Sequence, residues 1–321
     1  MKKFSLFLQR QILLLTFKTS KKEKCNSNHC RHRLYGIRHT DFCGTNLSTK
    51  MRTTLLFLFL SLMAQRANST DADTVKLKVN YAVKCYQYKG QEQPKNDEMV
   101  LEVGSKYVHF YSRYSVERRH IQDSILAAGG TAQDVLAAQA KSMFPRPPQH
   151  FQIWKNYPES GKLTFTDVLL KMYIYTEDLL RPKWELLSQD SIVAGYACRK
   201  ATTHYRGRTW NVWYTPEISV PEGPWQLFGL PGLILEAEDS EHLFSFSCIE
   251  IKQIFGKPMN FPKKKSIECS KEEYYQLKKL EWLDPYGFAE KISGFRSKGY
   301  DAQGREIVYP KRIAIFLDND V

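Results

Sequence analysis

The 321-residue sequence lacks the short motifs that mark the common enzyme classes. After residue 69 it contains no G-x-S-x-G, H-E-x-x-H, G-x-x-x-x-G-K-[ST] or G-x-G-x-x-G string. Each of these strings positions a nucleophile, a metal ligand or a phosphate through local backbone geometry. Their absence removes the most direct indications of serine hydrolase, zinc protease, nucleotide hydrolase and dehydrogenase chemistry. We therefore predict no catalytic residue, no metal site and no cofactor.

The sequence also lacks a hydrophobic run long enough for a membrane-spanning helix. A mainly apolar run of nine residues, Leu55 to Met63, is far shorter than the roughly 20 residues that a spanning helix needs. It follows the basic start Met51-Arg52-Thr53-Thr54 and precedes a small-residue exit that ends near Ser69. This order is typical of a secretory signal peptide. No cysteine stands at the exit, which argues against a lipoprotein anchor, so we expect an exported protein in the periplasm, at the outer-membrane periphery or secreted.

A signal peptide at residues 51–69 divides the chain into three parts. Residues 1–50 are interpreted as a disordered upstream extension from an incorrectly assigned start, and residues 70–321 as one β-rich domain. Residues 1–69 hold 13 Lys and Arg against two acidic residues, so most of the formal net charge of +13 lies there. Its removal leaves a nearly neutral domain, which gives no reason to expect nucleic acid as a partner. The Cys- and His-rich segment 25–43 fits no zinc-finger spacing.

Four cysteines remain in the expected mature chain: Cys85, Cys198, Cys248 and Cys269. An even number in an oxidising compartment permits two disulfides, with three possible connectivities. Free cysteines buried on strands are an equal alternative, because an unpaired cysteine behaves as a small hydrophobic residue. Both interpretations stay open at this stage.

Alternation of apolar and polar residues dominates the mature chain and predicts strands. The expected strands are Val75 to Cys85, 99–103, 106–111, 150–154, 163–166, 170–175, 192–205, 209–214, 233–238, 242–251 and 312–317. Helices are expected over 116–128, 131–143 and from Ser270 to Trp282, with capping boxes at Thr131/Asp134 and Ser270/Glu273. The predicted fold is mainly β (α+β): an antiparallel, curved open sheet or half-barrel with two or three helices packed on one face.

The segment FGLPGLILEAED, residues 228–239, joins a turn to a strand. Proline and glycine at the second and third positions of Leu230 to Leu233 predict a type II turn. The hexapeptide consists of Gly229, Leu230, Pro231, Gly232, Leu233 and Ile234. We interpret it as a structural corner that feeds a core strand, and the alternative is a rigid lip beside a pocket.

Residues 191–250 as a whole, and this hexapeptide above all, resemble the GLPGLI family. The similarity includes Gly195 to Ala201, Tyr205 to Trp210 and Trp213 to Ile218, in the order that the family shows. The resemblance implies an exported protein of Bacteroidota, in a family whose biochemical function is unassigned. It supplies no catalytic residues.

Arginines and aromatic residues gather around the predicted hairpin turn at 206–208. The candidate ligand-binding residues are Trp210, Trp213, Trp225, Phe228, Arg206 and Arg208. Guanidinium groups beside indole rings can hold an anion against an aromatic platform. The alternative is a solvated hairpin tip without a ligand.

Three functions are compatible with these patterns. We expect a non-enzymatic ligand-binding or accessory protein that takes an apolar, peptide or lipid-like ligand or another envelope protein. One alternative is an envelope hydrolase with an acid–base pair drawn from Glu236, Glu238, Asp239, His204 and His242. The other is a structural or surface-assembly protein. The hydrolase requires two of its groups to converge in a pocket.

Overall fold

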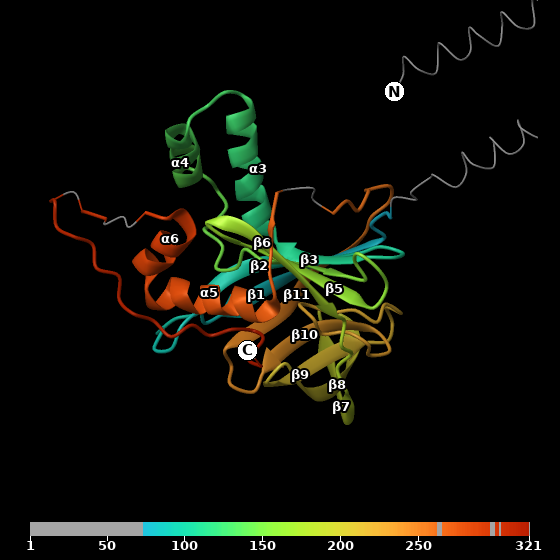
Figure 1. Ribbon diagram of the computed structural model, residues 1–321. Helices are drawn as coiled ribbons and strands as arrows, with labels where there is room; N and C mark the ends of the chain where they lie inside the picture. The colour runs from blue at the N-terminus through green and yellow to red at the C-terminus, as the bar shows by residue number, and fades with distance from the viewer. Residues whose placement is uncertain (1–72, 262–264, 296–298, 302, 321) are drawn as a thin grey trace, which may run out of the picture. The chain divides into compact units, whose positions relative to one another are not determined.

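The computed structural model describes residues 73–320 apart from 262–264, 296–298 and 302 (Figure 1). The described residues belong to a compact unit that spans Thr70–Val321. The predicted extension, the signal peptide and the Cys- and His-rich segment 25–43 lie outside them. No helix in the described part of the chain is both long and apolar enough to cross a membrane.

Twelve strands in the described residues form one sheet (Figure 1). In chain order they are β1 (Leu77–Cys85), β2 (Lys95–Val103), β3 (Val108–Ser112), β4 (Gln152–Lys155), β5 (Lys162–Leu169), β6 (Lys171–Asp178), β7 (Glu185–Val193), β8 (Tyr196–Tyr205), β9 (Arg208–Thr215), β10 (Leu233–Asp239), β11 (Phe244–Gln253) and β12 (Ile267–Glu268). Their spatial order is β12-β6-β5-β4-β3-β2-β1-β11-β10-β9-β8-β7. All neighbours are antiparallel except β12 and β6. The predicted class, a mainly β open antiparallel sheet with packed helices, is confirmed.

Four helices accompany the sheet in the described residues: α3 (Arg113–Ala127), α4 (Ala132–Ala140), α5 (Lys271–Leu283) and α6 (Pro285–Ser293). Both predicted capping boxes are present, at the start of α4 and at the start of α5. Helix α6 was not predicted: the last expected helix ends at Trp282, and Asp284-Pro285, which follows it, is typical of a helix stop. Asp284 ends α5 and also caps α6, and Pro285 occupies a first-turn position where its missing N–H costs nothing.

Two strand predictions were wrong. The strand expected over 192–205 is two strands, β7 and β8, joined at Ala194-Gly195, where both residues have positive φ. The strand expected over 312–317 is not formed. That segment instead attaches to Tyr88 through one isolated bridge at Ala314, with hydrogen bonds from Lys89 N to Ile313 O and from Ile315 N to Gln87 O. One isolated bridge does not make a strand. We call this segment, residues 312–317, the C-terminal strap.

The hexapeptide 229–234 contributes mainly to the core. Leu230, Leu233 and Ile234 are at most 2% exposed. The turn differs from the predicted type II turn. It is tighter, since Gly232 N donates to Leu230 O, two residues earlier, at 2.8 Å. Leu233 N donates instead to Ile218 O at 3.1 Å. Gly232 has φ +151°, and a Cβ at this position would lie 2.1 Å from the carbonyl oxygen of Thr215. Glycine is therefore required here by the close approach of two backbones.

Candidate functional site

The aromatic residues predicted to bind ligand take part in packing. Trp210 and Trp225 are 0% and 2% exposed, and their ring centroids lie 5.6 Å apart in the core. Trp213 is partly buried beside Lys200. Phe228 lies under the Lys155 ammonium, whose Nζ is 5.0 Å from the ring centroid. None of the four residues lines either of the two cavities described below.

The two predicted arginines are engaged in buried ion pairs. Arg208 lies 2.9 Å from Asp239, contacts Glu241, and donates to Phe316 O at 2.7 and 3.0 Å. Arg206 lies 3.0 Å from Glu177 and 3.7 Å from Asp318. Their side chains are 3% and 8% exposed. Because carboxylates neutralise both guanidinium groups, they fasten the hairpin to neighbouring segments, and the binding site must be sought elsewhere.

The acid and histidine candidates for hydrolysis do not converge in a cavity. Glu238 and His242 form an ion pair of 2.9 Å with both side chains at least half exposed. Asp239 is buried and pairs with Arg208 while accepting from the Leu243 and Phe244 amides. Neither of the two cavities described below includes Glu236, His204 or these three residues.

The four cysteines of the described chain are free, so neither of the two possible disulfides is formed. Cys85 and Cys198 are buried, which agrees with the alternative of unpaired cysteines on strands. Burial raises the pKa of Cys85 to about 12 and that of Cys248 to about 11. Thiols with such values are poor nucleophiles near neutral pH.

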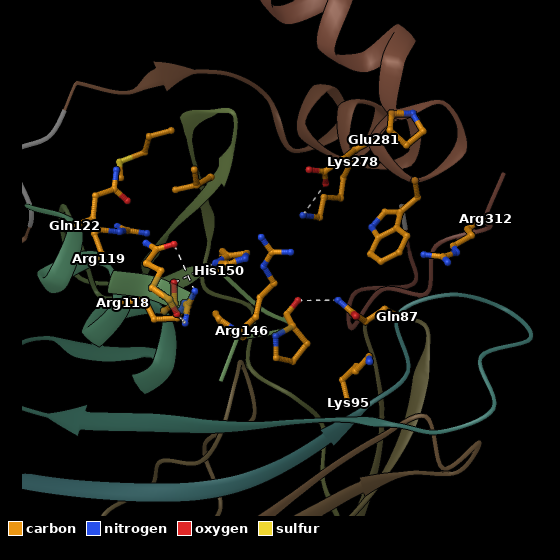
Figure 2. Close-up of a pocket in the computed structure, with 18 of the residues that line it drawn as sticks. Gln87, Lys95, Arg118, Arg119, Gln122, Arg146, His150, Lys278, Glu281 and Arg312 are labelled. Atoms are coloured by element: carbon orange, nitrogen blue, oxygen red, sulfur yellow. Dashed lines mark hydrogen bonds and ion pairs between the residues drawn. The ribbon is translucent and has the colours of Figure 1, made fainter. Parts of the chain in front are cut away.

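The larger cavity has a volume of about 990 Å³ and lies among parts of the chain that are distant in sequence (Figure 2). Its walls come from the start of β2, from α3, from the proline-rich connector 145–148, from α5 and from the C-terminal strap. We call this feature the basic cavity, because its lining within the described residues has seven cations against Asp123 and Glu281. The cations are Lys95, Arg118, Arg119, Arg146, Lys265, Lys278 and Arg312.

Some of these cations also hold the walls together. Arg118 donates to Gln139 O at 3.1 Å and to Phe144 O at 2.9 Å, and so ties α3 to the end of the α3–α4 hairpin. Lys278 Nζ lies 3.1 Å from Glu281 and 3.4 Å from Asp167. Among the described residues, Arg119 and Arg146 form no ion pair. Their charge is therefore available to a ligand.

His150 is a partly buried lining residue of the basic cavity and lies just before β4 in the chain. Its Nδ1 is 3.3 Å from Ser115 Oγ in the first turn of α3. Burial lowers the pKa of His150; Asp167 opposes this effect, and the cations Lys278, Arg119 and Arg146 add to it. The imidazole is therefore neutral at pH 7, and a positive electrostatic potential surrounds it.

One wall of the basic cavity is aromatic. The Arg312 guanidinium lies 4.3 Å from the Tyr88 ring centroid, and Tyr88 lies 5.7 Å from Trp282. The Arg312 amide also donates to Trp282 O. This stack joins the C-terminal strap to α5 and gives the cavity an apolar ring surface beside its charges.

A smaller cavity of about 330 Å³ lies next to the basic cavity, and Arg119 and Asp123 line both. Inside it, His109 stacks on Trp154 with ring centroids 3.8 Å apart. Burial lowers the pKa of His109 to about 3, against the effect of the hydrogen bond with Gln152. This histidine is a neutral packing residue.

Sequence reasoning did not find the basic cavity, because its cations stand alone or in pairs on six separate segments. The local sequence features of this cavity are the adjacent pair Arg118-Arg119 and the proline-rich connector Pro145 to Pro148, and neither indicates a cavity by itself. Helices were predicted over 116–128 and 131–143, but no local pattern indicates that α3 and α5 line the same cavity.

Comparison with known proteins gives one family match. The model of a family described as "N-glycanase peptide, N-terminal domain" matches residues 136–276. Two solved structures of PNGF-II, in the P21 and C2 space groups, are each 16% identical to the chain, with TM-scores of 0.42 and 0.41. The alignments cover 64% and 62% of this chain and 33% and 32% of those chains, so this chain spans about a third of their length. No curated protein matches.

Proposed function

We propose that this chain is an exported, non-enzymatic binding protein that holds a polyanionic saccharide in the basic cavity. The observation that carries the proposal is the convergence of seven cationic side chains from six segments on one cavity. Cations so distributed suit a ligand with several negative groups spread along its length. The charge of the lining favours an anion over the apolar, peptide or lipid-like ligand that the sequence suggested.

The size and chemistry of the cavity support a saccharide. A volume of about 990 Å³ is at the upper end of the range for small-molecule sites, roughly 300–1,000 Å³. Trp282, beside Tyr88, offers a flat apolar surface for the face of a sugar ring. The match of residues 136–276 to an N-glycanase N-terminal domain favours a carbohydrate as the carrier of the charges. Export is proposed from the signal-peptide pattern of residues 51–69.

Isothermal titration calorimetry with a heparin-derived tetrasaccharide tests this function. We expect binding that weakens as salt rises, because screening reduces attraction between exposed charges. The double substitution Arg119→Ala/Arg146→Ala should weaken binding at least about tenfold, since a hydrogen bond to a charged group contributes about 1.5–3 kcal/mol. The de-sulfated, N-acetylated tetrasaccharide should bind more weakly than the sulfated one.

Arg199→Ala/Lys106→Ala is the matched control, because both residues are exposed cations outside the cavity. It removes the same net charge and should leave the affinity nearly unchanged. Equal losses in the two double variants would mean that the saccharide is attracted by overall charge, and the basic cavity would then not be its site.

A further inference from the structure

We propose that His150 forms an oxyanion subsite in the basic cavity and takes up one proton when a doubly charged oxyanion binds there. The inference rests on the proposed function and adds to it the chemical class of the recognised group, a sulfate or phosphate ester. It also gives the site a defined dependence on pH.

The subsite is built from groups on four parts of the chain. Ser115 Oγ lies 3.3 Å from His150 Nδ1, and both residues line the cavity. Figure 2 shows Arg118 and Arg119 on one side of His150 and Arg146 on the other. Lys278 lines the cavity from α5. A hydroxyl, an imidazole and four cations are the donors that a tetrahedral oxyanion accepts from.

Four charged groups shift the pKa of His150, and each belongs to a different element. Arg119 belongs to α3, Arg146 to the proline-rich connector, Asp167 to β5 and Lys278 to α5. Burial raises the pKa of Asp167, but Lys278 and the Tyr274 hydroxyl lower it more, so the pKa of this carboxyl stays below its usual value. Burial likewise opposes the charge of Lys278, while Asp167 and Glu281 raise its pKa. Asp97 of β2 also titrates near this site, because it accepts from the Gln149 amide next to His150 and burial raises its pKa to about 7. The His150→Gln variant below separates the two titrations.

The electrostatic effect of the ligand determines the direction of the proton transfer. In the free protein, burial and the surrounding cations oppose protonation of His150. A bound dianion neutralises those cations and places negative charge next to the ring, so the pKa of His150 rises on binding. A group whose pKa rises on binding takes up a proton, and by linkage the affinity must increase as the pH falls.

The test uses inorganic sulfate as the probe, because sulfate stays doubly charged between pH 5 and 8. Sulfate affinity of the full chain is measured by calorimetry at constant ionic strength from pH 5.5 to 8, in buffers of different ionisation enthalpy. We expect the sulfate affinity to fall by up to about tenfold for each unit that the pH rises within the transition. Net proton uptake should be largest where this slope is steepest. Imidazole NMR should show the pKa of His150 rising when sulfate is added.

His150→Gln keeps a polar side chain and should abolish both the pH dependence and the proton uptake. His120→Gln is the control, since His120 is an exposed residue of the same helix as Arg119 and lies outside the basic cavity. This control should retain both effects.

Four results would overturn the inference. Sulfate affinity that does not change with pH, or an equal pH dependence in His150→Gln, would exclude His150 as the proton acceptor while leaving saccharide binding intact. Failure of sulfate to bind, when the heparin tetrasaccharide does bind, would exclude a discrete oxyanion subsite. If neither sulfate nor the tetrasaccharide binds, the proposed function itself fails.

Discussion

Lys155 Nζ lies 2.8 Å from Glu222 Oε2, and the lysine side chain is only 1% exposed. The ion pair joins β4 to the loop that leads into the hexapeptide 229–234, and Glu222 O accepts from Ile234 N in the same region. A buried charge must have a partner, because desolvation makes an unpaired one very unfavourable. The pair therefore fixes β4 relative to the loop that precedes the hexapeptide.

Removal of one member of this pair should destabilise the protein strongly. We expect Glu222→Gln to lower the free energy of unfolding by about 3 kcal/mol, because it leaves the Lys155 ammonium without its counter-charge. Lys155→Met/Glu222→Leu should recover most of the loss. Urea denaturation followed by circular dichroism measures both. A loss below about 0.5 kcal/mol in Glu222→Gln would show that the pair does not hold the two segments together.

Gly232→Ala should be among the most damaging glycine substitutions in the chain. The new Cβ would lie 2.1 Å from the Thr215 carbonyl oxygen, so β9 and the turn must separate. Gly256→Ala is the matched control, because Gly256 also has positive φ but a Cβ there would meet nothing within 4 Å. We expect about 1 kcal/mol for the control, from backbone strain alone, and a clearly larger loss for Gly232→Ala. Similar melting temperatures for the two variants would contradict the packing argument.

Asp97 should make stability depend on pH. Burial raises the pKa of Asp97 to about 7, although bonds from Ser112 and from the Glu98 and Gln149 amides oppose this. Because the folded-state pKa exceeds the unfolded one, the contribution of Asp97 is complete below about pH 4 and is lost as pH rises toward 7. The loss approaches about 1.4 kcal/mol per pH unit within this window.

Asp97→Asn should remove that slope and leave the remaining pH dependence in place. The measurement is urea denaturation of both proteins between pH 4 and 8. Parallel stability profiles for the two proteins would mean that Asp97 ionises with its ordinary pKa in the folded state.

The four cysteines at positions 85, 198, 248 and 269 should remain thiols even in an oxidising compartment. Intact mass should not change on reduction, and all four should react with a thiol reagent after denaturation. Without denaturation, Cys85 and Cys198 should react slowly, because both are buried. A mass increase of 2 or 4 Da on reduction would contradict the free-thiol arrangement.

Local signals in the sequence predicted local structure well. The pairs Thr131/Asp134 and Ser270/Glu273 mark helix starts because a capping box depends on residues three positions apart. The turn at Ala194-Gly195 was missed, since only Gly195 is a typical turn residue and apolar alternation continues on both sides. The C-terminal strap around Ala314 has the sequence pattern of a strand, but in the structure it pairs with Tyr88 through a single bridge. No local pattern specifies how many bridges a segment forms.

The candidate site could not be predicted in this way. Trp210 and Arg208 suggested a surface site because an aromatic beside a cation has the same sequence pattern whether it is exposed or buried. In the structure Trp210 is in the core and Arg208 is neutralised by Asp239, 31 residues further along the chain. Arg119 and Arg146, in contrast, gain their significance only from the tertiary arrangement that brings them to one cavity.

The most direct test of the central claim is a crystal structure of the protein with the heparin-derived tetrasaccharide. We expect saccharide density in the basic cavity, with sulfate groups within hydrogen-bond distance of Arg119 and Arg146 and a sugar ring against Trp282. Saccharide density on another surface, with the basic cavity filled only by solvent, would contradict it.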